Sequence, residues 1–78
     1  MPTIKHINGP YRFFFYSFDC NEPKHVHVQR ERFTGKFWID PIMLSKNKGF
    51  SPKELNNILK EIRVNIGRIK EAWDEHCG

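Results

Sequence analysis

The feature that most constrains the fold is the run His-Val-His-Val at residues 25–28. Successive side chains of a β-strand point to opposite faces, so the two valines share one face and the two histidines share the other. Valine packs well in a sheet core, whereas imidazole is polar and titrates near neutral pH. This run therefore predicts a strand with a hydrophobic core on one side and a pair of histidines on the other.

Further strands are expected around this one. Residues 11–18 are almost all aromatic and are apolar on both faces of a strand, which predicts a strand covered on both sides. With strands at residues 25–32 and 36–40, they form an antiparallel meander. Residues 3–7 alternate weakly and could add an edge strand, giving three to four strands, while residues 45–49 are expected to be a polar loop.

The clearest helix signal begins at Ser51. Serine at the N-cap, Pro52 at the first helical position and Glu54 at the third match a capping box. The apolar residues that follow recur every three or four positions; they are Leu55, Ile58, Leu59, Ile62, Ile66, Ile69 and Trp73. We therefore expect one long helix over residues 52–76, packed on one face of the sheet in a single α+β domain that comprises residues 1–78.

Composition narrows the class of protein. The chain has 78 residues, with 13 lysines and arginines against 9 acidic residues, for a net charge of +4. This moderate basic excess suits an anionic partner, although it also suits an ordinary soluble surface. No secretory or membrane-spanning stretch is visible, which predicts a cytoplasmic protein without a membrane partner. Cys20 and Cys77 are accordingly expected to be free thiols.

Several motifs together resemble a known family. They are MPTI at residues 1–4, RFFFYS at 12–17, EPKHVHV at 22–28, KFW at 36–38, GF at 49–50 before Glu54, and Trp73. Over nearly its whole length the chain is similar to a small bacterial family catalogued as a domain of unknown function, number 4160. Members often carry a second proline where this chain has Lys24. The resemblance implies a bacterial cytosolic protein whose gene neighbours another small gene, as in toxin–antitoxin pairs, and it supplies no catalytic residue.

The histidine pair could be part of a metal site. Two histidines separated by one residue on a strand can direct both imidazoles toward one ion, with Cys20 or the His76-Cys77 pair as further ligands. However, no Cys-x-x-Cys motif is present and the spacing fits no standard zinc module. We therefore expect no metal and no cofactor.

Two other interpretations of His25 and His27 stay open. The rings could be the acid and base of a small ribonuclease, since imidazole titrates near neutral pH. The favoured interpretation is structural, with both rings packed among aromatic residues and hydrogen-bonded to the backbone, Asp40 or Glu31. The sequence does not decide whether the protein is an enzyme.

The sheet face opposite the helix is a candidate binding surface. The residues expected there are Arg12, Phe14, Tyr16, His25, His27, Gln29, Lys36, Trp38 and Asp40. Aromatic side chains flanked by cations on a sheet are typical of surfaces that bind single-stranded RNA. The same face would also serve as a dimer interface, which buries aromatic area.

We therefore predict a non-enzymatic interaction protein, one half of a toxin–antitoxin-like pair that acts as a homodimer or in a complex with the product of a neighbouring small gene. Its basic residues are expected to contact RNA, DNA or that partner. The candidate binding residues are Arg30, Arg32, Lys36, Trp38, Lys60, Arg63 and Lys70. The alternative is a small ribonuclease toxin in which His25 and His27 are catalytic.

Overall fold

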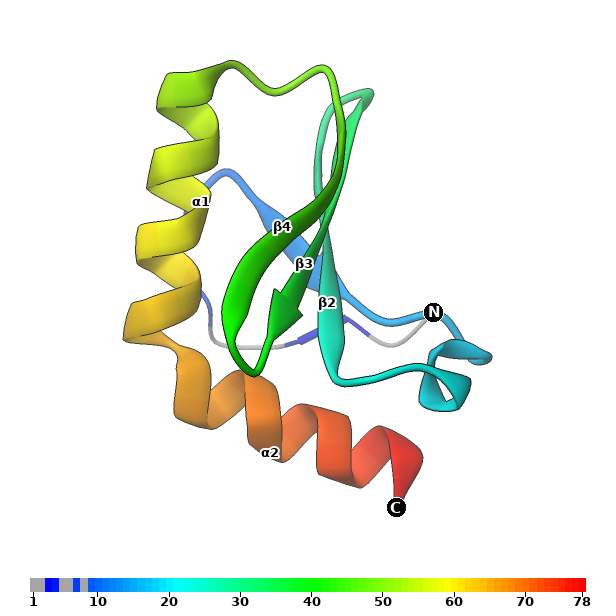
Figure 1. The fold of residues 1–78 in the computed structure, drawn as a ribbon. Helices are drawn as coiled ribbons and strands as arrows, with labels where there is room; N and C mark the ends of the chain where they lie inside the picture. Colours follow the sequence, from blue (N-terminus) through cyan, green and yellow to red (C-terminus); the bar gives the residue numbers. More distant parts are fainter. Residues whose placement is uncertain (1–2, 5–6, 8) are drawn as a thin grey trace.

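The structure is a computed structural model that describes residues 3–4, 7 and 9–78. It is an α+β domain with a four-stranded antiparallel sheet and two helices (Figure 1). The elements are β1 (Arg12–Phe14), a short 3-10 helix η1 (Asp19–Asn21), β2 (His25–Arg30), β3 (Phe33–Ile39), β4 (Ile42–Lys48), α1 (Pro52–Val64) and α2 (Ile66–Cys77). The strands lie side by side in chain order, so the predicted meander is confirmed.

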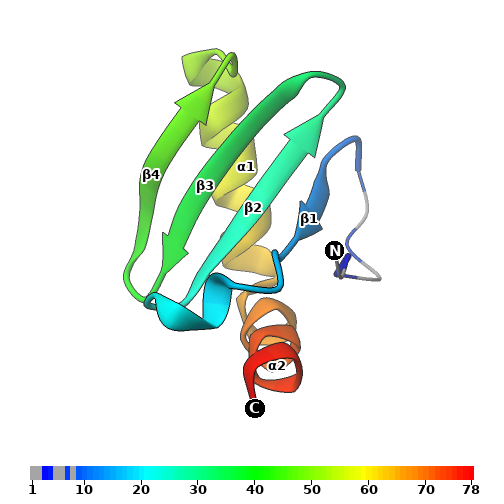
Figure 2. The same cartoon turned by 90° about the vertical axis from the view of Figure 1, so that its right-hand side faces the viewer.

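The alternation in β2 divides the sheet into two faces as predicted. Val26 pairs with Phe37, and Val28 pairs with Gly35; both valines are fully buried in the core with Ile58 of α1. His27 pairs with Lys36 on the opposite face. Figure 2 shows this second face toward the viewer, with α1 behind the sheet. We call it the open face, because α1 covers only the other side.

The strands differ from the predicted bounds at both edges of the sheet. β1 ends at Phe14 because the Tyr16 N–H is bound by the side chain of Asp19 and the chain turns away from the sheet. β4 was not predicted: most of the loop expected at residues 45–49 continues a strand that pairs with β3. Backbone hydrogen bonding holds this strand although most of its side chains are exposed. Of the weak strand expected at residues 3–7, residues 5 and 6 lie outside the described residues, and Thr3 forms an isolated bridge with Phe14.

The prediction of one long helix was wrong. The helix is interrupted at Asn65, whose backbone angles are φ −106° and ψ 17° and whose side-chain amide donates to the Glu61 carbonyl at 2.8 Å. α2 then runs in a new direction past the end of the sheet (Figure 1). This change of direction allows Ile69 and Trp73 to be buried in the same core as Ile62. Neither α1 nor α2 is long and apolar enough to cross a membrane, and no other helix of the described residues is.

The predicted helix start is confirmed, with one change in its contacts. The Ser51 Oγ accepts the Glu54 N–H at 3.2 Å, and Pro52 is the first residue of α1. The Glu54 carboxylate, expected to turn back to the N-cap, instead accepts from the Arg30 guanidinium at 3.0 and 3.1 Å. Ser51 therefore caps the helix as expected, whereas the Glu54 side chain links α1 to β2 through Arg30.

Replacing Ser51 by alanine should lower the free energy of unfolding by about 1 kcal/mol, because the Glu54 N–H loses its acceptor. Urea denaturation of the variant beside the wild type measures this change. Ser51→Asp is the control, since aspartate is an equally good N-cap and should keep the wild-type midpoint. If Ser51→Ala also keeps that midpoint, the cap contributes nothing to stability.

Candidate functional site on the open face

The open face carries a shallow hollow of about 370 Å³. Strands β1 to β4 and the connection between β1 and β2 contribute to its lining. The lining combines aromatic side chains (Phe14, Tyr16 and Phe18), lysines (Lys36, Lys46 and Lys48), and Asp19 with His27, which lies between Phe14 and Lys36 in the sheet register. Two chemically distinct parts therefore adjoin each other: an aromatic and basic surface, and a cluster built on Asp19.

The aromatic side of the hollow is a series of packed rings with increasing exposure. Tyr16 contacts buried Phe14 edge-on at 5.3 Å between ring centroids. Phe18 stacks on Tyr16 at 5.5 Å with an interplanar angle of 6°. Phe18 is 67% exposed, although phenylalanine usually lies inside. The outermost ring therefore offers its free face to an incoming planar group.

The basic side of the hollow comes from β3 and β4. Lys46 lies across from Lys36, and Lys48 lies across from Thr34. The Lys36 ammonium sits 4.7 Å from the centre of the Trp38 ring and is paired with Glu22. Lys46 and Lys48 are exposed and form no ion pair with any residue that the structure describes. Two cations are therefore free to bind an anion at this edge.

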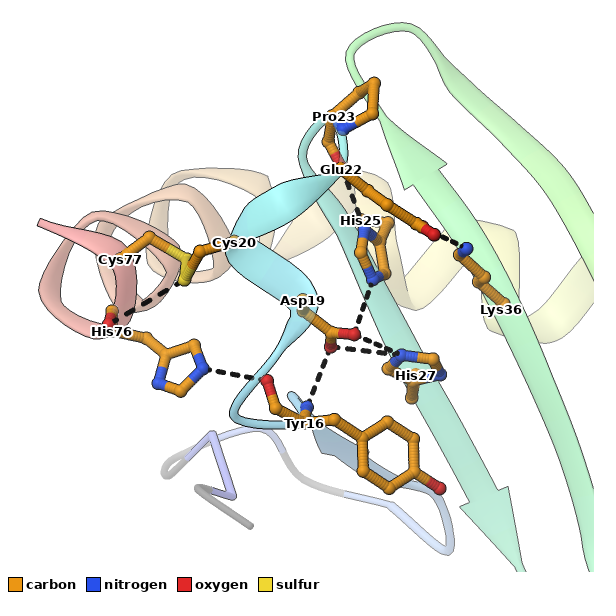
Figure 3. Close-up of polar contacts among 10 residues, drawn as sticks. All are labelled: Tyr16, Asp19, Cys20, Glu22, Pro23, His25, His27, Lys36, His76 and Cys77. Carbon is orange, nitrogen blue, oxygen red and sulfur yellow. Dashed lines mark hydrogen bonds and ion pairs between the residues drawn. A yellow bond between two sulfur atoms is a disulfide. The ribbon is translucent and has the colours of Figure 1, made fainter.

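Beside these two groups, the Asp19 carboxylate lies between two histidines (Figure 3). Its Oδ1 is 3.1 Å from His25 Nε2, and its Oδ2 is 3.1 Å from His27 Nε2. Oδ2 also accepts the Tyr16 N–H at 2.7 Å, while the Asp19 N–H donates to the Tyr16 carbonyl at 3.1 Å. This reciprocal pair of bonds closes the turn that places Asp19 over the start of β2.

The surroundings of Asp19 favour its charged form. Burial alone raises the pKa of this carboxyl, but the Tyr16 N–H and the contacts with His25 and His27 outweigh burial, so the pKa lies below its ordinary value. Burial lowers the pKa of His27, and the Asp19 carboxylate only partly offsets this effect. At neutral pH the cluster therefore contains a carboxylate beside a neutral His27 ring, which directs Nε2–H at it.

His25 is the most enclosed member of the cluster. Its side chain has no solvent exposure and packs against Trp38 and Trp73 at 5.6 and 5.2 Å between ring centroids. Its Nδ1 donates to the Pro23 carbonyl at 2.8 Å. Its Nε2 is buried and has no hydrogen-bond partner within the part of the chain that the structure describes, although Asp19 Oδ1 is 3.1 Å away. A polar atom in the core of the cluster is thus left unsatisfied.

A disulfide holds the segment that carries Asp19. Cys20 and Cys77 are bonded, so the prediction that both are free thiols was wrong. His76 Nε2 lies 2.9 Å from the Tyr16 carbonyl, and its ring stacks on Phe15. The end of α2, at the left of Figure 3, thereby fixes the connection between β1 and β2. As disulfide sulfurs, Cys20 and Cys77 are not thiolate ligands.

The predicted binding residues fall on different sides of the molecule. Lys36 and Trp38 are on the open face, and Arg32 is exposed in the turn between β2 and β3. Arg30 points toward α1 and pairs with Glu54 at 3.0 Å. Three more are on the helices: Lys60, Arg63 and Lys70. The structure brings Lys36 and Trp38 together but leaves the helix cations away from the hollow.

The sequence-based prediction missed Asp19, Phe18, Lys46 and Lys48. Both lysines belong to the segment predicted as a loop, and Lys-Asn-Lys in fact alternates as a strand does. Asp19 replaces Asp40 and Glu31, which we expected as histidine partners. It is six residues before His25, and no spacing rule links a turn aspartate to a following strand.

The fold and the hollow define a small α+β protein with a helix on one face of its sheet and aromatic, basic and histidine side chains on the other. The chain belongs to the family described as Domain of unknown function (DUF4160), whose model matches residues 11–74. The resemblance noted in the sequence is thus confirmed. No curated protein and no solved structure matches the chain.

Proposed function

We propose that the protein is a non-enzymatic binding module that takes single-stranded RNA on its open face. The observation that carries this proposal is the hollow, whose lining combines the exposed Phe18 ring with Lys46 and Lys48, which form no ion pair with any described residue. A net charge of +4 favours the encounter with an anionic partner.

The two sides of the hollow match the two recognisable parts of a single strand. Unpaired bases present flat faces that stack on aromatic side chains, and the phosphates attract lysine. Phe18 and Tyr16 already stack in parallel, so a base can continue the stack on the exposed ring. Lys46 and Lys48 line the same hollow and can then contact the backbone.

The ribonuclease alternative receives less support from the geometry. Acid–base cleavage needs both imidazoles within hydrogen-bond reach of the reacting atoms. His27 lines the hollow with 16% of its side chain exposed, but the His25 side chain has no exposure at all. A substrate on the open face would therefore contact one histidine of the pair.

We also propose the wider setting that the family resemblance implies: a cytoplasmic, toxin–antitoxin-like pair with the product of a neighbouring small gene. β4 supports a protein partner or a second copy, because it is an edge strand with Met43 and Leu44 exposed at 55% and 41%. In the cytoplasm, Cys20 and Cys77 would exchange between dithiol and disulfide.

RNA binding should weaken linearly with salt on a log–log plot, and removing Lys46 and Lys48 should reduce the slope. For a single strand, two lost phosphate contacts correspond to a change of about 1.4 in slope. Phe18→Ala should weaken binding by about 1–3 kcal/mol through lost stacking, at every salt concentration. Fluorescence anisotropy with a short labelled single-stranded RNA measures both effects.

The matched control is Lys60→Ala/Arg63→Ala, which removes the same charge from α1 on the far side of the sheet. This pair should leave the salt slope unchanged. Equal effects from the two double variants would show that binding follows net charge rather than the open face. If the wild-type protein does not bind the RNA even at low salt, the proposal is wrong.

A further inference from the structure

We infer that Asp19, His25 and His27 form a binding site for a divalent transition ion, with Zn²⁺ as the first choice. The inference concerns the cluster built on Asp19 and does not depend on RNA binding. It revises the expectation of no metal, which rested on spacing in the sequence alone. The three ligand atoms are one carboxylate oxygen and the Nε2 atoms of both histidines, and all lie within 4.8 Å of one another.

The separations within the cluster suit a tetrahedral ion. Ligand atoms at about 2.0–2.2 Å from tetrahedral zinc lie about 3.3–3.5 Å from each other. His25 Nε2 is 3.1 Å from Asp19 Oδ1, and His27 Nε2 is 3.3 Å from the same oxygen. The separation between the two Nε2 atoms is at most 4.8 Å, so an ion would draw the two rings together and displace the His27 proton from Nε2 to complete three ligand bonds.

The unsatisfied Nε2 of His25 is the second, independent observation. A carbonyl oxygen can only accept, so the bond to Pro23 engages Nδ1 and leaves Nε2 as the ring atom that a ligand can use. That Nε2 is buried, has no hydrogen-bond partner among the described residues, and faces Asp19 Oδ1 at 3.1 Å. An ion bound by both atoms would supply the partner that the buried nitrogen lacks.

The contacts behind the ligands have the form found around protein metal sites. A histidine ligand typically donates its other ring N–H to a carbonyl, which fixes the tautomer, and His25 does this with Pro23. Asp19 is held by the Tyr16 N–H, and its neighbour Cys20 is bonded to the end of α2. The ligands therefore sit on a well-supported framework, as a metal site requires.

The donor set indicates the class of ion and leaves room for a further ligand. Imidazole nitrogen selects Zn²⁺ and its neighbours in the transition series over Mg²⁺ and Ca²⁺, which prefer oxygen. Three protein ligands are one fewer than tetrahedral zinc needs, and a fourth can be water or an exogenous group. Asp19 and His27 both line the hollow, so this fourth position is expected to be reached from the open face.

Zinc titration of the full, oxidised chain tests the inference, because the disulfide then keeps Cys20 and Cys77 from binding the ion. Calorimetry should give one equivalent of Zn²⁺ bound, and Mg²⁺ should give no signal. Histidine-selective ¹⁵N NMR should show changes at the Nε2 atoms of His25 and His27, with Nδ1 of His25 still protonated. This readout tests His25 in the wild-type protein. It avoids a substitution at so buried a residue, which would risk unfolding the chain.

His27→Gln should weaken zinc binding by about 100-fold or more. Loss of a residue that only hydrogen-bonds to a metal ligand typically lowers metal affinity about 10- to 100-fold, and His27 is itself a ligand. His76→Gln is the matched control: it removes a histidine outside the cluster and retains an N–H for the Tyr16 carbonyl. Equal zinc affinity in His27→Gln and the wild type would overturn the inference. So would a His25 Nε2 that carries a proton and does not respond to zinc, because that proton would then occupy the place between Nε2 and Asp19 that the inference gives to the ion.

Discussion

Opening the Cys20–Cys77 disulfide should lower the free energy of unfolding by about 4 kcal/mol. The bond joins residues 57 positions apart, and a cross-link of this span removes much of the conformational entropy of the unfolded chain. A domain of this size has a total stability on the order of 4–12 kcal/mol. The reduced protein is therefore expected to keep only part of its stability, and the disulfide to be a main support of the fold.

Urea denaturation with and without reductant measures this effect, and the Cys20→Ser/Cys77→Ser variant should resemble the reduced wild type. Reductant added to the double variant is the control and should change nothing. Hydrogen exchange at Tyr16 and Asp19 should also accelerate on reduction, because Cys20 anchors their turn to α2. Equal unfolding midpoints for oxidised and reduced protein would contradict the prediction.

The parts of the fold that could be predicted from the sequence are those encoded by neighbouring residues. The alternation at residues 25–28 assigned the two faces of β2, because strand geometry relates each side chain directly to the next. Ser51 and Pro52 located the start of α1 to the residue, since the cap is a contact within one turn. Neither inference required knowledge of how distant segments pack.

The break at Asn65 could not be predicted in the same way. Apolar residues continue at helical spacing from Ile62 through Ile66 to Ile69, so the periodicity alone describes one uninterrupted helix. The interruption is instead favoured by tertiary packing, because the redirected α2 buries Trp73 against Phe15 and His25. Asparagine at the junction is permissive for a break but does not require one.

The candidate site depends on that break, which is why the sequence did not reveal it. A straight helix would carry Cys77 away from the sheet, and the disulfide to Cys20 could not form. Without that bond, nothing in the sequence indicates that the turn at Asp19 folds back over β2 toward His25. The histidine pair itself was visible, but its carboxylate partner is placed by contacts between the two ends of the chain.

Replacing Asp19 by alanine should cost about 3 kcal/mol or more, the second of the two largest effects we expect. The carboxylate is 3% exposed and contacts two imidazoles and one backbone N–H. Removing one member of a buried charged network leaves the others without partners in a poorly solvated site, which costs more than the contacts contribute on balance. The turn at Tyr16 would lose its side-chain bond at the same time.

Asp74→Ala is the matched control for this change, because the same carboxyl group is removed from an exposed position. The Asp74 side chain is 66% exposed and pairs with Lys24 at 3.6 Å, so its loss should change stability by no more than about 0.5 kcal/mol. Urea denaturation of both variants in the oxidised state separates the effect of losing a buried carboxylate from the effect of losing a negative charge. If Asp19→Ala is no less stable than Asp74→Ala, the carboxylate does not organise the cluster, and the two histidines must be held by the packing of Trp38, Trp73 and Phe14 alone.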